Sequence, residues 1–359
     1  MLAMNYNDNN VYKNKTVLVT GHPGFKGTWL VKILQMCGAN VIGYALQNEG
    51  KESLFDMMNF GENVTSIIGD IRDYEKLEKV IKKYRPEFVF HLAAQPIVRR
   101  SYVEPLYTYS TNVMGTVNLL EALRKVECVK SIVNVTTDKV YENEEIDKPY
   151  VEEDKLDGYD PYSNSKSCSE LVTHSYYKSF FKEMGVSIST ARAGNVIGGG
   201  DFAENRILPD CIRAALRDEM IVVRNPDSIR PYQHVLEALS VYLMIAEKQY
   251  FDGNMAGAYN VGPDDIDCWK TRQIVECFCE QWGNGIQWQV KNEQGMHEAS
   301  ILKLDCSKLK RKFGWKPIWN VEKAIEKTVE CAKEYNSGNV ERIVEQQIIE
   351  FFAEKKLGE

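Results

Sequence analysis

The segment TVLVTGHPGFKG, residues 16–27, decides the fold of this chain. Five residues rich in β-branched side chains predict a buried strand, and a glycine-rich loop then leads into the amphipathic run 26–37. The glycines Gly21, Gly24 and Gly27 are spaced so that bare backbone amides and a helix N-terminus can face a pyrophosphate. The alternative is a tight turn that needs glycine for its geometry alone. We expect a dinucleotide site here.

The alternation of short apolar runs with longer amphipathic runs continues to about residue 195, which is typical of a parallel sheet covered by helices. Gly38 suits the left-handed end of the first helix, and Asp160-Pro161 suits a cap followed by a first-turn proline. We expect strands at 16–20, 41–46, 64–68, 88–92, 131–136 and 186–191, and helices at 26–37, 74–84, 104–125 and 161–184. The predicted fold class is α/β, a doubly wound parallel Rossmann sheet with a smaller C-terminal lobe and with ligands at the carboxyl ends of the strands.

Beyond Asn195 the rhythm breaks into glycine-rich loop and scattered short strands. We therefore divide the chain into a disordered tail (1–14), a Rossmann domain (15–194, with 228–262 returning to it), a smaller lobe (195–320) and C-terminal helices (321–359).

Composition excludes several classes of protein. With 44 Lys and Arg against 51 Asp and Glu, the net charge of −7 argues against a nucleic-acid surface. No apolar run approaches the ~20 residues that span a bilayer, so we expect no membrane partner. The nine cysteines lack paired zinc spacing and no secretory segment opens the chain, which indicates reduced thiols, a cytoplasmic location and no metal.

Tyr162 and Lys166 stand four residues apart on the helix that begins after Asp160, so they share a face. A tyrosine has a pKa near 10, and its use as a base near pH 7 requires a fall of roughly three, or about 4 kcal/mol. A neighbouring ammonium and a positive nicotinamide both favour the phenolate. Thr137, at the end of the preceding strand, can hydrogen-bond a substrate hydroxyl. The trio predicts a hydride-transfer site; the alternative is a surface Tyr–Lys pair.

Asp138 and Lys139 follow Thr137 directly and could move protons in the same pocket. Further cofactor contacts are expected along the nucleotide path, from the glycine loop and from the ends of the third and fourth strands. The second strand ends without an acidic residue or an arginine for the ribose, so the sequence favours NAD over NADP without deciding it. The expected cofactor residues are Gly21, Gly24, Phe25, Lys26, Gly27, Asp70, Ile71, Leu92, Ala93, Ala94, Gln95, Asn112, Tyr162 and Lys166.

From about residue 15 to 319 the chain resembles the extended short-chain dehydrogenase/reductases, the NAD-dependent epimerase/dehydratase family. Within that family it resembles the CDP-glucose 4,6-dehydratases. The motifs that carry the resemblance are GHPGFKG (21–27), HLAAQP (91–96), TTDKVY (136–141), Tyr162 with Lys166, ARAGNVIGGGD (191–201) and RPYQHV (230–235). Related dehydratases that act on dTDP-glucose usually have Asp-Glu where this chain has Asp138-Lys139.

The resemblance implies a lyase that uses tightly held NAD on CDP-glucose. Tyr162 would remove the C4 hydroxyl proton, Asp138 would protonate the departing C6 hydroxyl, and the product would be CDP-4-dehydro-6-deoxyglucose for deoxysugar and lipopolysaccharide O-antigen synthesis. Lys139 is either the C5 base, a charged group that stabilises the enolate oxygen, or a lysine paired with a carboxylate. Dehydration of another nucleotide hexose, 4-epimerisation and noncatalytic dinucleotide sensing remain alternatives.

The resemblance also assigns the lobe 195–320 to sugar-nucleotide binding. Guanidinium groups can grip a diphosphate bidentately, and Arg230 is the favoured partner. The expected substrate contacts are Gln95, Arg100, Asn195, Arg206, Arg213, Arg230 and Tyr232. The helical face 105–124 is expected to build a homodimer or homotetramer, as comparable helices do in the family.

Overall fold

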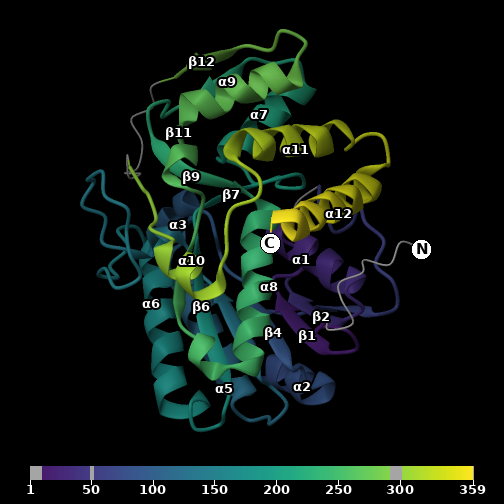
Figure 1. The fold of residues 1–359 in the computed structure, drawn as a ribbon, viewed down its shortest axis with the longest axis vertical. Coiled ribbons are helices and arrows are strands. Elements are labelled where there is room, and N and C mark those ends of the chain that lie inside the picture. The colour runs from purple at the N-terminus through teal and green to yellow at the C-terminus, as the bar shows by residue number, and fades with distance from the viewer. Residues whose placement is uncertain (1–9, 49–51, 292–300, 359) are drawn as a thin grey trace.

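A computed structural model describes residues 10–48, 52–291 and 301–358. Its main sheet has seven parallel strands in the order β10-β6-β5-β4-β1-β2-β3 (Figure 1). The strands are β1 (Thr16–Thr20), β2 (Asn40–Ala45), β3 (Val64–Ile68), β4 (Phe88–His91), β5 (Ser131–Val135), β6 (Ser187–Ala193) and β10 (Ala258–Val261). The order reverses between β1 and β4, and such a switch point leaves a crevice beyond the strand ends in which ligands bind. The predicted fold class is confirmed.

Helices cover both faces of this sheet, as two separate buried clusters of apolar side chains require. α1 and α8 pack on one face with α12 beside α1, and α2, α5 and α6 lie on the other (Figure 1). The helices around the sheet are α1 (Phe25–Met36), α2 (Tyr74–Tyr84), α3 (Val98–Val103), α4 (Pro105–Tyr109), α5 (Gly115–Leu123), α6 (Pro161–Tyr176), α8 (Val235–Phe251), α10 (Ser307–Phe313) and α12 (Val340–Gly358).

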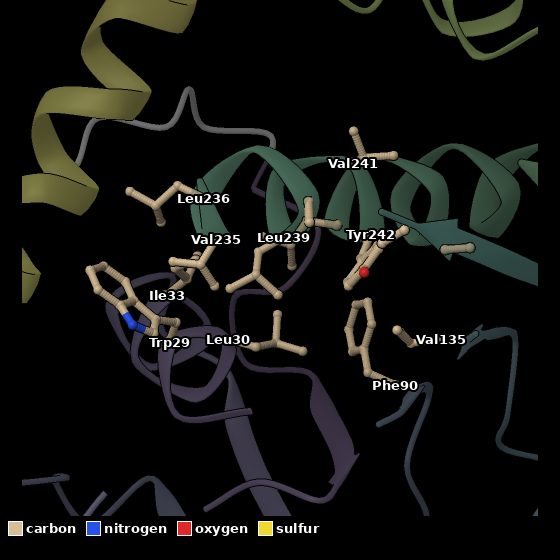
Figure 2. Close-up of a cluster of buried hydrophobic side chains, with 14 of the residues drawn as sticks. Trp29, Leu30, Ile33, Phe90, Val135, Val235, Leu236, Leu239, Val241 and Tyr242 are labelled. Atoms are coloured by element: carbon tan, nitrogen blue, oxygen red, sulfur yellow. The ribbon is translucent and has the colours of Figure 1, made fainter. Parts of the chain in front are cut away.

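The largest cluster fixes α1, the helix that follows the glycine loop. Figure 2 shows Trp29 and Ile33 of α1 against Val235 of α8, with Phe90 of β4 below Tyr242. Trp29 is fully buried, and its indole Nε1 donates a hydrogen bond to the Gly199 carbonyl at 2.8 Å. Burial of an aromatic side chain of this size stabilises the fold by roughly 2–3 kcal/mol. The N-terminus of α1 is therefore held rigidly against the sheet.

The smaller lobe gathers at one end of the molecule (Figure 1). Its strands are β7 (Asn195–Ile197), β8 (Ile221–Val223), β9 (Ile229–His234), β11 (Cys268–Lys270) and β12 (Trp288–Val290), and its helices are α7 (Ile207–Leu216), α9 (Thr271–Trp282) and α11 (Val321–Lys333). A third apolar cluster, which includes Ile212, Phe278 and Ile325, holds these elements together. β7 continues the path of β6, so the lobe is joined to the sheet at the carboxyl edge.

Two expected helices are interrupted. The segment 104–125 contains a π-helical turn at Ser110–Met114, and the segment 161–184 passes into another at Tyr177–Phe181. π-turns are often found at functional sites. Asn112 lies in the first of them, and its amide group bonds the backbone N–H and C=O of Gln95 at 2.8 and 3.1 Å. The extra residue in this turn thus points an amide at the loop after β4.

The expectation of a disordered tail differs from the structure at residues 10–14; residues 1–9 lie outside the described residues. Tyr12 is buried, with its ring 4.9 Å from that of Phe88, and its hydroxyl donates to the Leu243 carbonyl at 2.6 Å. The asparagine-rich composition of this segment suggests disorder, but burial of the Tyr12 ring orders residues 10–14.

Candidate active site

A cavity of about 340 Å³ opens where the carboxyl ends of β5 and β6 meet the smaller lobe. The side chains that converge on it include Thr137, Asp138, Lys139 and Tyr162 from the sheet side. Arg206 and other residues of the lobe form the opposite wall. The cavity reaches the crevice between β1 and β4 through Phe25, Lys26 and residues 96–99, and it contains the chemical groups expected from the motifs.

Helix α6 positions Tyr162 and Lys166. The Asp160 carboxylate accepts a hydrogen bond from the Ser163 N–H at 3.0 Å, which caps the helix, and Pro161 begins it. Lys166 Nζ donates to the Val135 carbonyl at the end of β5, at 3.0 Å. Both side chains are buried, and they lie one turn apart on the same face as expected.

Burial dominates the proton affinities of these two groups. It raises the pKa of Tyr162 to about 12, although a hydrogen bond with Thr137 and the charge of Arg206 offset part of the rise. It lowers the pKa of Lys166 to about 8, against the raising effect of Glu170. The lysine therefore stays mostly protonated at pH 7, while the phenol needs additional positive charge before it can act as a base.

Asp138 and Lys139 form a close pair in a short 3-10 turn after β5. Asp138 is 1% exposed; its Oδ1 accepts from the Thr137 hydroxyl at 3.0 Å and lies 3.2 Å from Lys139 Nζ. Asp138 Oδ2 is buried without a hydrogen-bond partner among the described residues. Because a buried carboxylate oxygen is costly to leave unpaired, this atom is suited to meet a polar group of a ligand.

The glycine loop packs closely against the backbone of neighbouring segments. Gly21 has φ +74°, and a Cβ there would stand 2.8 Å from the backbone N of Ala93. A Cβ on Gly27 would stand 2.2 Å from the Gly21 carbonyl oxygen. The loop can take no larger residue at either position, and its bare amides stand at the start of α1, where a pyrophosphate is favoured.

The other residues expected to hold the cofactor have varied settings. Arg72 engages both carboxylate oxygens of Asp70. The buried Ile71 packs against Gly115. The amides of Leu92 and Ala93 donate to the Thr20 hydroxyl at 3.2 Å. Ala94 follows in the loop after β4, and Phe25 and Lys26 line the cavity. Their contact with a nucleotide remains a prediction.

Of the expected substrate contacts, Asn195, Arg206, Arg230 and Tyr232 line the cavity. Arg206 Nη1 is paired with Asp201 at 2.8 Å, and Arg230 is buried with Nη1 2.8 Å from the Ile229 carbonyl. Asn195 Oδ1 accepts from Lys139 Nζ at 3.4 Å. These side chains place cations opposite the sheet, where a diphosphate can bind.

Gln95, Arg100 and Arg213 are not among the described residues that line the cavity, so their contact with the substrate stays a prediction. The Gln95 amide holds its own loop, donating to the Ile97 carbonyl and the Thr108 hydroxyl at 3.1 and 3.0 Å. Arg100 pairs with Glu104 at the surface at 2.6 Å.

Arg213 faces a smaller hollow instead, where it donates to the Phe202 and Ala203 carbonyls and pairs with Asp210. On α7 the sequence could not tell which side faces the ligand.

The cavity wall also contains polar residues that the sequence does not point to, among them Arg99, Asn143 and Arg224. Arg99 directly precedes Arg100, the expected substrate contact, and nothing in the sequence distinguishes the two arginines. Arg224 follows β8 and belongs to no motif, so its place depends on how the lobe folds back over the sheet. Arg224 Nη1 donates to Asn205 Oδ1 at 3.0 Å, which holds the guanidinium at the mouth of the cavity.

Residues 18–328 match the GDP-mannose 4,6 dehydratase family. The chain belongs to this family. A CDP-glucose 4,6-dehydratase of Salmonella typhimurium is 46% identical over 337 residues, which cover 92% of this chain and 94% of that protein. The resemblance to extended short-chain dehydrogenase/reductases is thus confirmed.

Solved structures from the wider family share the fold. UDP-glucose 4-epimerase of Thermus thermophilus, described as a complex with NAD, is 25% identical with a TM-score of 0.77, over 89% of this chain and 99% of that one. A dTDP-glucose 4,6-dehydratase of Bacillus anthracis is 24% identical with a TM-score of 0.75, over 90% and 98%. This family member therefore has relatives of both catalytic types, dehydratases and epimerases.

Proposed function

We propose that this protein is a lyase that dehydrates CDP-D-glucose to CDP-4-dehydro-6-deoxy-D-glucose. The reaction comprises oxidation at C4, loss of water across C5 and C6, and reduction at C6. The observation that carries the proposal is the unpartnered Oδ2 of Asp138 in the same cavity as Tyr162. An epimerase has no use for this carboxylic acid, because it removes no C6 hydroxyl. The 46% identity to a CDP-glucose 4,6-dehydratase supports the same choice.

NAD is the proposed cofactor. Gly21 and Gly27 allow the loop to pack tightly before α1, whose N-terminus suits a pyrophosphate, and a structural relative is described in complex with NAD. When bound, NAD supplies the acceptor for the C4 hydrogen, the donor at C6 and a positive ring beside the phenol. The second strand ends without an arginine for a 2′-phosphate, which also favours NAD.

Tyr162 is proposed to take the proton of the C4 hydroxyl. Thr137 bonds the phenol and can orient the same substrate hydroxyl. Lys166, whose ammonium is held by the Val135 carbonyl one helical turn further along α6, is proposed to add a positive charge that favours the phenolate. Additional positive charge is needed, because burial keeps the pKa of Tyr162 at about 12 even with the lowering effects of Thr137 and Arg206.

The Asp138–Lys139 pair is proposed to carry the loss of water. The C4 ketone acidifies C5, so Lys139 in its neutral form can remove the C5 proton while protonated Asp138 gives its proton to the departing C6 hydroxyl. The two atoms are 3.2 Å apart, so one proton can then pass back from the ammonium to the carboxylate. The pair is thereby reset. C5 takes a proton from solvent when C6 is reduced, and Tyr162 releases to solvent the proton that it took from the C4 hydroxyl.

An oligomer, either a homodimer or a homotetramer, is proposed from the face formed by α3, α4 and α6, which pack together. Val103, Leu106 and Leu171 are 75%, 83% and 56% exposed on these helices. Large apolar side chains grouped on a surface mark an interface. Light scattering of Leu106→Lys should show a smaller particle than the unaltered protein.

A cytoplasmic location is also proposed. All nine cysteines are free thiols, as expected in a reducing compartment. Among the described helices, none is long and apolar enough to cross a membrane.

The decisive experiment is a substrate panel. CDP-, dTDP-, UDP- and GDP-glucose are incubated separately with the protein, and the 4-keto-6-deoxy product is measured by mass spectrometry as loss of one water. We expect the product from CDP-glucose first. Formation of CDP-galactose without a ketone would instead establish a 4-epimerase, and a product from another nucleotide would move the substrate assignment.

A further inference from the structure

The segment that carries Asp138 and Lys139 is anchored at both ends. At its start, the Thr136 hydroxyl donates to Glu170 Oε1 at 2.5 Å. At its end, the Tyr141 hydroxyl accepts from Arg192 Nη1 at 2.9 Å and donates to Asn260 Oδ1 at 2.5 Å. The turn between these anchors contains only residues 137–140. A displacement of Thr136 or Tyr141 would therefore move Asp138 and Lys139 as well.

The two anchors converge on a single buried ion pair. Glu170 Oε2 lies 2.9 Å from Arg192 Nη2, and the side chains are 3% and 4% exposed. Arg192 Nη1 also donates to the Glu152 carbonyl at 2.9 Å, and Thr190 donates to Glu170 Oε2 at 2.7 Å. We call Thr136, Tyr141, Glu170 and Arg192 the clamp. A buried pair held from so many sides permits one geometry.

Tyr162 and Lys166 are held by other contacts. The Asp160 cap fixes the start of α6, and the Val135 carbonyl fixes the Lys166 ammonium. These two bonds do not involve Thr136 or Tyr141. The two groups are nevertheless linked, because Ser167 Oγ of α6 donates to the Val140 carbonyl at 2.7 Å and Thr137 of the segment bonds Tyr162. Thr136 and Tyr141 therefore hold the Asp138–Lys139 turn directly and the groups on α6 only through it.

We propose that Glu170 and Arg192 are positioning residues that set the reach of Asp138 and Lys139 toward C5 and C6 of the hexose. The inference rests on the proposed function. Proton transfer depends steeply on the distance between the reacting atoms, and a displacement of 1 Å can lower a rate by roughly a hundredfold. Loosening the clamp therefore slows the elimination more than the oxidation at C4, in which Thr137 is the one residue of the segment that takes part.

The test uses near-isosteric variants that keep both buried charges. Thr136→Val releases the start of the segment, and Tyr141→Phe releases its end. Thr190→Val is the matched control, because it removes a hydrogen bond to the same carboxylate without touching the segment. For each protein, single-turnover absorbance of the reduced nicotinamide reports oxidation at C4, and solvent-deuterium incorporation at C5 with loss of water reports the elimination.

We expect the two segment variants to slow elimination at least about tenfold more than they slow C4 oxidation, so that reduced nicotinamide accumulates. Thr190→Val should change neither rate by more than about twofold. The proposal would be overturned if the segment variants slowed C4 oxidation and elimination equally. It would also be overturned if Thr190→Val slowed elimination selectively, as the segment variants are expected to do. Failure of the unaltered protein to release water from any nucleotide hexose would refute the proposed function instead.

Discussion

Lys26 offers a sharp test of the electrostatics of the cavity. It stands in the first turn of α1, lines the cavity and lies 5.9 Å from the ring centre of Tyr242. Burial, helped by repulsion from Lys166 and Arg206, lowers the pKa of its ammonium from 10.5 to about 7. Asp138 and Asp201 compensate only in part. In the protein without nucleotide, burial of the Lys26 ammonium in the cavity wall therefore lowers the free energy of unfolding.

The magnitude follows from that pKa. At ~1.4 kcal/mol for each tenfold change in proton affinity, the fall to about 7 corresponds to at most about 5 kcal/mol. Because Lys26 is only partly removed from water, we expect Lys26→Met to stabilise the protein by roughly 1–3 kcal/mol at about pH 6. The native state binds fewer protons than the unfolded chain above pH 7, so the stability of the unaltered protein rises with pH there. The difference in free energy of unfolding between Lys26→Met and the unaltered protein should therefore decrease as the pH rises above 7.

Urea unfolding at several pH values measures both effects. Lys32→Met is the matched control on the same helix, because Lys32 is buried but paired with Glu341 and Glu345 at 2.8 and 2.6 Å. We expect that control to destabilise the protein by about 1 kcal/mol, since it removes the partner of two glutamates on α12. A Lys26→Met protein that is less stable than the original at about pH 6, or whose difference does not vary with pH, would refute the reasoning.

Three further outcomes follow from the site. Lys139→Met should lower solvent-deuterium exchange at C5 by about tenfold or more, and undiminished exchange would exclude the lysine as base. The turnover rate should decline above about pH 8, because Lys166, whose pKa burial lowers to about 8, then loses the charge that assists Tyr162; a flat pH–rate profile would contradict this role. Asp160→Ala should cost about 1 kcal/mol in urea unfolding through loss of the α6 cap, whereas Asp160→Asn should cost less, and equal losses would argue against the cap.

Local features were predictable from the sequence, and features that depend on packing across the fold were not. The strand before Gly21, and the shared face of Tyr162 and Lys166, follow from spacing along one element, so both were found. Arg206 and Arg213 are equally plausible anion partners by composition, yet the register of α7 turns one toward the cavity and the other away.

Contacts between distant segments leave even less trace in the sequence. Arg192 belongs to the motif at residues 191–201, but its ion pair with Glu170 joins β6 to α6. The periodicity of the sequence does not predict such a pair between distant elements. The position of Gln95 after β4 predicts a ligand contact, but the sequence does not show that its amide also donates to the Ile97 carbonyl and the Thr108 hydroxyl. Polar side chains near a site thus need their partners to be known before a role can be assigned.

The position of β10 and α8 bears on how the chain reaches its native state during synthesis. α8 covers α1 and the sheet, and β10 completes the edge beside β6, but both emerge only after β7, β8 and β9 of the smaller lobe. Until residue 261 leaves the ribosome, Trp29, Phe90 and the apolar flank of β6 lack their cover (Figure 2). A nascent fragment that ends near residue 194 should therefore aggregate readily and be cleaved easily by proteases. Chaperone binding should decrease once α8 and β10 have packed against α1 and β6.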